Sequence, residues 1–132
     1  MATRSQARQS VVELLYAYEV GNKDIIKSID ILLENKKIRN KQKEFDINIF
    51  NGVLENIDNI DKSIIENLSK RGIDDLGMVE KSILRLSIYE IMYQDLDKAI
   101  IINEAIELSK KMAYDTAPKF INALLDKINK IT

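Results

Sequence analysis

The sequence predicts an all-α protein of about seven helices without a sheet, and three observations lead to this prediction. The 132 residues include only one Pro and four Gly, so few positions force a helix to break. Val, Ile and Leu recur at spacings of three and four residues, which is the period of one face of a helix. The strict alternation of apolar and polar residues that is typical of half-buried strands does not occur.

The amino-terminal half predicts three helices, which cover residues 3–19, 24–35 and 44–57. Gly21 and Asn22 form the stop between the first two, since Gly and Asn favour the backbone that ends a helix. Residues 36–43 are strongly basic and lack periodic apolar side chains, which favours a connecting loop. The side chains expected to face the core are Ala7, Val11, Leu14, Leu15, Tyr18, Ile25, Ile29, Leu32, Leu33, Phe45, Ile49, Val53, Leu54 and Ile57.

The carboxy-terminal half predicts four more helices, which cover residues 61–68, 78–96, 103–112 and 116–131. Asp61 is the expected N-cap of the first, and Asn103 has the same role in the third. Gly72 and Gly77 bracket an acidic turn. The helix over 78–96 is the most apolar and is expected at the centre of the core, while Pro118 lies in the first turn of the last helix. The shortest helix should bury Ile64, Ile65 and Leu68.

Length and composition exclude several classes of function but do not identify one. The length fits one domain over residues 1–132. The chain has no Cys and no His, which excludes disulfides, thiolate chemistry and imidazole catalysis. No spacing of carboxylates or Gly indicates a catalytic, metal or cofactor site. We therefore expect that the protein is not an enzyme and binds no cofactor. Without a long apolar run or a leader peptide, the expected location is the cytoplasm, with no membrane partner.

Two groups of residues are candidates for contact with single-stranded RNA. The net charge is −1, so any affinity for RNA must come from a local cluster of cations. Arg4 and Arg8 are four residues apart, hence on one helix face from which they could contact successive phosphates. Lys119 and Phe120 combine a charge with an aromatic ring, and Asp115 beside them would weaken binding by repulsion. On spacing alone, a solvated helix start and a core Phe are the favoured explanations of these residues.

A third group is acidic and consists of Asp74, Asp75 and Glu80. A solvated turn explains it without any function. If the group binds a partner, that partner is basic, and the charges would accelerate encounter and set orientation more than they would add affinity.

Four segments of the chain carry a family resemblance: ARQSVVELLY at the start, VEKSILRLSIYEIMY and INEAIELSKKM in the second half, and APKFINALLDKI near the end. They resemble the NusB family of bacterial transcription antitermination factors. The resemblance extends over residues 7–128 and is strongest from Leu76 onward. It implies two packed helical bundles, with sub-bundles near residues 1–60 and 61–132. It departs from the family at Ser5 and Gln6, where relatives often carry Arg, and at Asp97, where they usually carry Pro and a looser loop is expected.

The resemblance also implies a function. NusB-type proteins bind the boxA element of nascent ribosomal RNA together with NusE, a small-subunit ribosomal protein, and join the RNA polymerase antitermination complex. Carried over by position, the RNA-binding candidates are Arg4, Arg8, Lys111, Asp115, Lys119 and Phe120. The candidates for the NusE interface are Tyr16, Asp74, Asp75 and Glu80.

Two other functions remain open. NusB-like domains also occur in ribosomal RNA cytosine methyltransferases, where they help to bind RNA for maturation, although 132 residues leave no room for a cofactor-binding domain. A helical protein-interaction module that binds NusE without RNA is the second alternative. The sequence does not distinguish a monomer from a homodimer.

Overall fold

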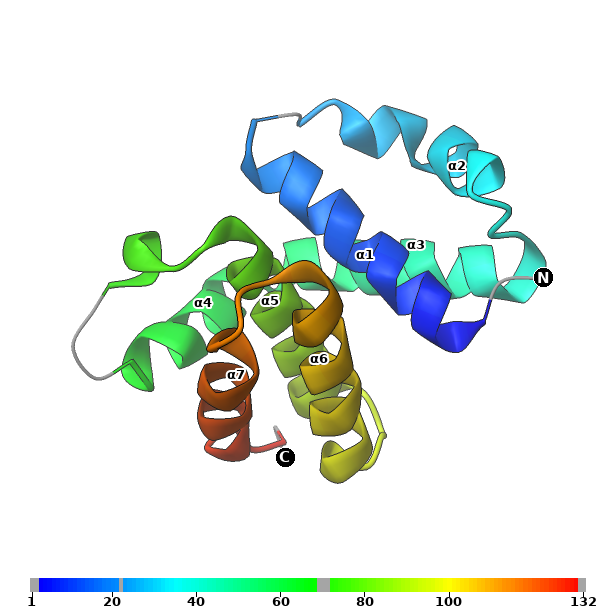
Figure 1. Ribbon diagram of the computed structural model, residues 1–132. Coiled ribbons are helices and arrows are strands. Elements are labelled where there is room, and N and C mark those ends of the chain that lie inside the picture. The colour runs from blue at the N-terminus through cyan, green and yellow to red at the C-terminus, as the bar shows by residue number, and fades with distance from the viewer. Residues whose placement is uncertain (1–2, 22, 69–71, 131–132) are drawn as a thin grey trace.

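The computed structural model describes residues 3–21, 23–68 and 72–130, and within them the chain folds into α-helices without a strand. Figure 1 shows the helices in chain order. Their bounds are α1 Arg4–Glu19, α2 Ile25–Asn35, α3 Asn40–Glu55, α4 Ile57–Glu66, the 3-10 helix η1 Ile73–Asp75, α5 Met78–Tyr93, α6 Lys98–Met112 and α7 Ala117–Asp126. The all-α prediction with seven helices is confirmed for the described residues.

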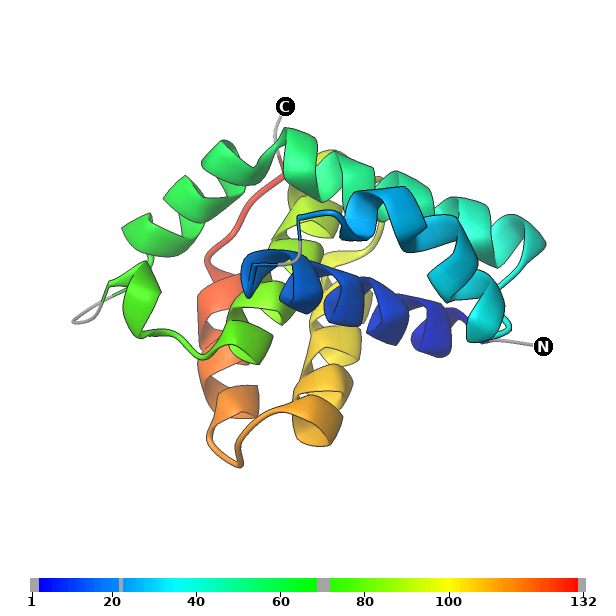
Figure 2. The same cartoon turned by 90° about the horizontal axis from the view of Figure 1, so that it is seen from above.

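Helix α5 lies at the centre of the molecule. It contacts α1, α3, α4, α6 and α7, and most of its residues are buried, so the prediction of a central fifth helix is confirmed. Two views at right angles show α1 beside α3 and α6 beside α7, with α5 between the two groups (Figures 1 and 2). The division into two bundles near residue 60 stays a prediction.

The predicted core is largely the observed one. The apolar stripes of α1 and α2 are buried at Ala7, Val11, Leu14, Leu15, Ile25, Ile29 and Leu33. Tyr18 is half-buried and packs edge-on against Phe50, with ring centroids 6.2 Å apart. One prediction is wrong: Ile65, expected inside, is 53% exposed. Among the described helices, none combines the length and the apolar character that crossing a membrane requires.

The connection between α2 and α3 is shorter than the sequence predicted. Helix α2 ends in a Schellman motif, in which the Lys37 N–H donates to the Glu34 carbonyl and the Ile38 N–H to the Leu33 carbonyl, both at 2.9 Å. Lys37 supplies the left-handed backbone with φ 61°, and Ile38 is buried. Helix α3 then begins at Asn40 instead of residue 44, so half of the predicted basic loop is helical.

The third and fourth predicted helices are divided at a different residue. Helix α3 ends at Glu55 and α4 begins at Ile57, with only Asn56 between them. The Gly52 carbonyl accepts two hydrogen bonds from Asn56, one from its side-chain amide at 2.8 Å and one from its backbone N–H at 3.2 Å. Asp61 therefore lies inside α4 and is not its N-cap, which corrects the prediction.

The ends of the last three helices also differ from the predictions. Asp97 is the N-cap of α6, because its side chain accepts a hydrogen bond from the Ala99 N–H at 2.9 Å. Helix α6 thus starts at Lys98 and Asn103 is internal to it, whereas the looser loop expected before this helix stays a prediction. Helix α5 ends at Tyr93, and α7 ends at Asp126 with Pro118 in its first turn as predicted. The other predicted limits, Asn22 and residue 131, lie outside the described residues.

Candidate functional site

The start of α1 presents one arginine to solvent. Thr3 and Gln6 form a capping box: the Thr3 hydroxyl accepts from the Gln6 N–H at 3.1 Å, and the Gln6 side chain accepts from the Thr3 N–H at 2.7 Å. The box places Arg4 in the first turn, where it is exposed. A cation in the first turn is disfavoured by the helix dipole, so helix stability gives no reason for Arg4 at this position.

Arg8 lies on the same helix but is buried. Its guanidinium donates to the Glu90 carboxylate on α5 from Nη2 at 2.7 Å and from Nε at 3.2 Å. The two side chains are 4% and 2% exposed. Burial raises the pKa of Glu90 above its usual range, although Arg8 acts in the opposite direction. The structure therefore does not present Arg4 and Arg8 together to solvent. An RNA contact by Arg8 stays a prediction.

An aromatic ring on α3 lies beside both arginines. The Arg4 guanidinium carbon is 5.2 Å from the centre of the Phe45 ring, and that of Arg8 is 5.5 Å away. Phe45 packs against the core as expected, but it is only half-buried, so part of its ring remains exposed. Sequence reasoning missed this contact because the ring and Arg4 are far apart in the chain.

A hydrogen bond joins the start of α1 to α6. The Ser5 hydroxyl donates to the Glu104 carboxylate at 3.2 Å. Lys111 lies seven residues after Glu104, hence on the same face of α6 and about 10.5 Å further along its axis. Lys111 is exposed in the last turn of α6, and Asp115 and Lys119 are exposed beyond it. One face of α6 thus leads from Ser5 toward the second group of RNA candidates.

Phe120 is less exposed than Lys111, Asp115 and Lys119, because it is half-buried and packs against the core. This position fits the core alternative better than a freely exposed stacking platform.

A groove of about 420 Å³ brings together two candidates for the partner interface. Its lining residues come from α1, the start of α5, and the end of α6, and they are Tyr16, Gly77, Met78, Val79, Glu80, Met112, Ala113 and Tyr114. Tyr16 is 41% exposed and Tyr114 75%, whereas Glu80 is buried in the wall. Sequence reasoning named Tyr16 and Glu80 but missed Tyr114.

The acidic residues before the groove are held in η1. Asp75 accepts a hydrogen bond from the Gly72 N–H at 3.1 Å, and both Asp74 and Asp75 are exposed. Asp74 and Asp75 are not among the residues that line the groove, so a single interface that includes both the groove and these carboxylates stays a prediction.

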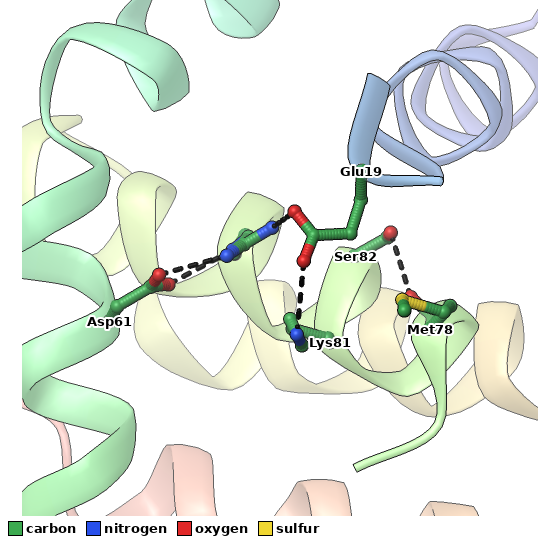
Figure 3. A network of polar contacts seen from close by, with 6 residues as sticks. Glu19, Asp61, Met78, Lys81 and Ser82 are labelled. Carbon is green, nitrogen blue, oxygen red and sulfur yellow. Dashed lines mark hydrogen bonds and ion pairs between the residues drawn. The ribbon is translucent and has the colours of Figure 1, made fainter. Parts of the chain in front are cut away.

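A charged network holds α5 against α1 and α4 (Figure 3). Glu19 of α1 accepts from Arg85 at 2.8 Å and from Lys81 at 3.1 Å, and Arg85 also donates to Asp61 of α4 at 2.9 and 2.8 Å. Burial alone would raise the pKa of Glu19, but the hydrogen bonds from Arg85 and Lys81 outweigh it and lower that pKa. Two acids and two bases balance each other, so the network joins three helices without net charge.

The described residues contain no cluster of three or more Asp or Glu side chains that could hold a metal ion together. The candidate surfaces are the exposed cations on α1 and α6 and, separate from them, a groove lined by Glu80 and two tyrosines.

Comparison with known proteins gives a consistent result. The model of the NusB family matches residues 5–130. The chain is 62% identical to the transcription antitermination protein NusB of Aliarcobacter butzleri over 98% of this chain and 99% of that protein, and 52% identical to that of Nitratiruptor over 98% and 94%.

Two solved structures are similar as well. T. maritima NusB superposes with a TM-score of 0.85 at 28% identity, over 96% of this chain and 89% of that one. NusB in a crystal structure of the antitermination factors NusB and NusE with double-stranded RNA superposes with a TM-score of 0.83 at 29% identity, over 93% and 92%.

Proposed function

The chain belongs to the NusB family, and from this premise we propose that it binds boxA RNA of nascent ribosomal transcripts together with NusE. The family makes it a transcription antitermination factor and not an enzyme. The proposed complex joins the elongating RNA polymerase in the cytoplasm and suppresses premature termination.

One observation carries the proposal. The similar NusB chain in the crystal structure with NusE and double-stranded RNA covers 93% of this chain. A protein with the same fold therefore forms a complex with NusE and RNA. In this chain, an exposed Arg4 at one end of α1 and a groove around Tyr16 toward the other end support two separate binding surfaces. In detail, we propose that the RNA is single-stranded boxA and that NusE binds in the groove.

The deciding experiment is a titration of fluorescent boxA RNA with this protein, alone and with purified NusE, against a scrambled RNA at the same salt concentration. We expect binding that is selective for boxA and becomes tighter with NusE. Binding of NusE without any RNA selectivity would contradict the proposal and support the protein-interaction module instead. If the protein binds any RNA and NusE has no effect, the result would support the alternative function of an RNA-binding domain in ribosomal RNA maturation.

Arg4→Gln is expected to weaken RNA binding because it removes an exposed cation without breaking an ion pair among the described residues. Removing one cation from a phosphate of a single strand lowers the slope of log K against log salt by about 0.7. The measurement is RNA affinity at several salt concentrations. Lys62→Gln is the matched control, since the Lys62 side chain is also exposed and belongs to α4 instead of α1. An unchanged slope for Arg4→Gln would remove Arg4 from the site.

Tyr16→Ala is expected to weaken NusE binding about tenfold or more, because aromatic residues at interfaces often contribute about 2 kcal/mol or above. Tyr16 is 41% exposed, so the fold should tolerate the change. Binding is measured by calorimetry with NusE alone. Ile31→Ala is the control, since Ile31 is 64% exposed on α2, outside the groove. Equal affinities of the wild type and Tyr16→Ala would place the interface elsewhere.

A further inference from the structure

The first turns of α3 contribute Lys41 and Phe45 to a surface beside Arg4, and neither of these two residues is among the RNA-binding candidates named so far. Two shallow hollows lie side by side there and share Lys41 and Phe45. The first measures about 290 Å³ and is completed by Arg4 and Gln42. The second measures about 310 Å³ and is completed by Glu44 and Asn48. We call them the α3 hollows. Their volumes lie at the lower limit of ligand pockets, which fits a strand lying across a surface better than an enclosed small molecule.

Lys41 provides an exposed positive charge between the α3 hollows. It has no ion-pair partner among the described residues, whereas Lys43 in the same turn pairs with Asp30 at 2.8 Å and Glu34 at 2.7 Å. The first turn of α3 contains no acidic residue. Because the helix dipole disfavours cations at this end, Lys41 does not stabilise the helix, and its charge remains available to a ligand.

Phe45 holds a second cation at the same place. The Arg4 guanidinium lies over its ring at 5.2 Å, a cation–π contact that limits the motion of a long exposed side chain. Arg4 has no ion-pair partner among the described residues either, so its donors remain free for phosphate oxygens or base edges. The aromatic ring and the two cations come from α1 and α3 and lie in one continuous surface.

The acids that face this surface are few. Glu44 lines the second hollow and carries no ion pair within the described part of the chain. Two other acids are neutralised by ion pairs. Glu34 of α2 pairs with Arg39 and Lys43, and Glu90 of α5 pairs with Arg8. The first hollow is therefore positive, and a negatively charged strand would pass along Arg4 and Lys41 on the side away from Glu44.

We propose that the α3 hollows are an extension of the RNA site, in which Lys41 contacts the phosphate backbone of single-stranded RNA and Phe45 positions Arg4 for the same strand. The inference rests on the proposed RNA-binding function and adds a second helix to it. Single-stranded nucleic acid is the ligand that suits a shallow positive surface with an aromatic ring, because charge neutralisation and ring contacts supply its affinity.

The first test uses a charge series in the full-length chain with NusE and fluorescent boxA RNA. Lys41→Gln should weaken binding several-fold and lower the salt slope by about 0.7, the value for one phosphate contact on a single strand. Glu44→Gln, three residues away, should strengthen binding, because it removes a repulsive charge from the same surface. Lys62→Gln on α4 should match the wild type.

The second test asks whether Phe45 acts through Arg4. Phe45→Leu keeps an apolar side chain against the core but removes the ring. If the ring positions Arg4, then Arg4→Gln should weaken RNA binding less in the Phe45→Leu background than in the wild type, as a double-mutant cycle measures. Equal effects of Arg4→Gln in both backgrounds would mean that Phe45 only packs. Thermal unfolding of each variant shows whether its fold is retained.

The outcomes separate this inference from the proposed function. If the wild type binds RNA but Lys41→Gln keeps its affinity and salt slope, the α3 hollows are not part of the site, while the proposed function stands. If Lys41→Gln weakens NusE binding and leaves RNA binding by the chain alone unchanged, the surface binds protein and the inference is overturned. If the wild type binds no RNA with or without NusE, both proposals fail.

Discussion

Arg8→Met is expected to destabilise the fold by about 3–5 kcal/mol, the usual cost of removing one partner from a buried ion pair. The Glu90 carboxylate, only 2% exposed, would then be without the 2.7 Å hydrogen bond that Arg8 donates. The raised pKa of Glu90 shows that burial already outweighs the attraction to Arg8. The variant must either bury an unpaired charge or protonate Glu90. The free energy of unfolding in urea measures the destabilisation.

The double variant Arg8→Met, Glu90→Leu should recover most of this stability, because no buried charge remains and two apolar side chains of similar size fill the space. This variant also provides a test of RNA binding by Arg8 in a folded protein. A salt slope equal to that of the wild type would assign Arg8 a structural role alone. If Arg8→Met by itself is as stable as the wild type, the ion pair does not hold α1 against α5.

Asp46→Asn is expected to remove a large part of the pH dependence of stability. Asp46 is fully buried on α3, and neither carboxylate oxygen has a hydrogen-bond partner among the described residues. Burial raises its pKa from 3.8 to about 8, against the attraction of Lys36 and Arg8. The folded protein therefore keeps a proton that the unfolded chain releases.

The sign of the effect follows from proton binding. Between about pH 4 and pH 8 the folded state binds more protons at Asp46 than the unfolded state, so this group makes stability fall as the pH rises. The slope is at most about 1.4 kcal/mol per pH unit for one proton, or about 3 kcal/mol between pH 5 and pH 7. Other carboxylates add their own pH dependence to the free energy of unfolding. Their contribution cancels when the value for the wild type is subtracted from that of the variant.

Urea unfolding of the wild type and Asp46→Asn at pH 5, 6 and 7 measures this difference. The stability of the variant relative to the wild type should increase steadily over the series. Asp46→Leu removes the same proton with a side chain that needs no hydrogen bond, and it should show the same trend from a different starting value. Parallel curves for all three proteins would mean that Asp46 is already ionised in the fold at pH 5.

Sequence periodicity predicted the helices because each helix buries one stripe against neighbours, and that stripe is visible in the local spacing. Val11, Leu14 and Leu15 of α1 show this clearly, and so does the apolar α5 at the centre. The prediction for Ile65 failed because an apolar residue on a short helix need not face the core, and local spacing does not show how wide the buried face is.

Helix boundaries were predicted less well because single side chains decide them. Asp97 caps α6 well before the predicted start, and Lys37 ends α2 in a left-handed conformation that a non-Gly residue adopts only rarely. Asn56 separates two helices that apolar spacing alone would divide elsewhere. In each case hydrogen bonds or backbone conformation at one residue, not the apolar pattern, determine the end.

The sequence by itself determined the all-α class, the central place of α5, the absence of Cys and His chemistry, and the family, because composition, local spacing and motifs are properties of neighbouring residues. Only the tertiary structure decided which polar groups meet. Arg8 pairs with Glu90, 82 residues away, and Arg4 meets Phe45 across two helices, while Tyr16 shares a groove with Glu80 and Tyr114. Burial and electrostatic pairing depend on distance in space, and folding brings together side chains whose separation along the chain carries no signal.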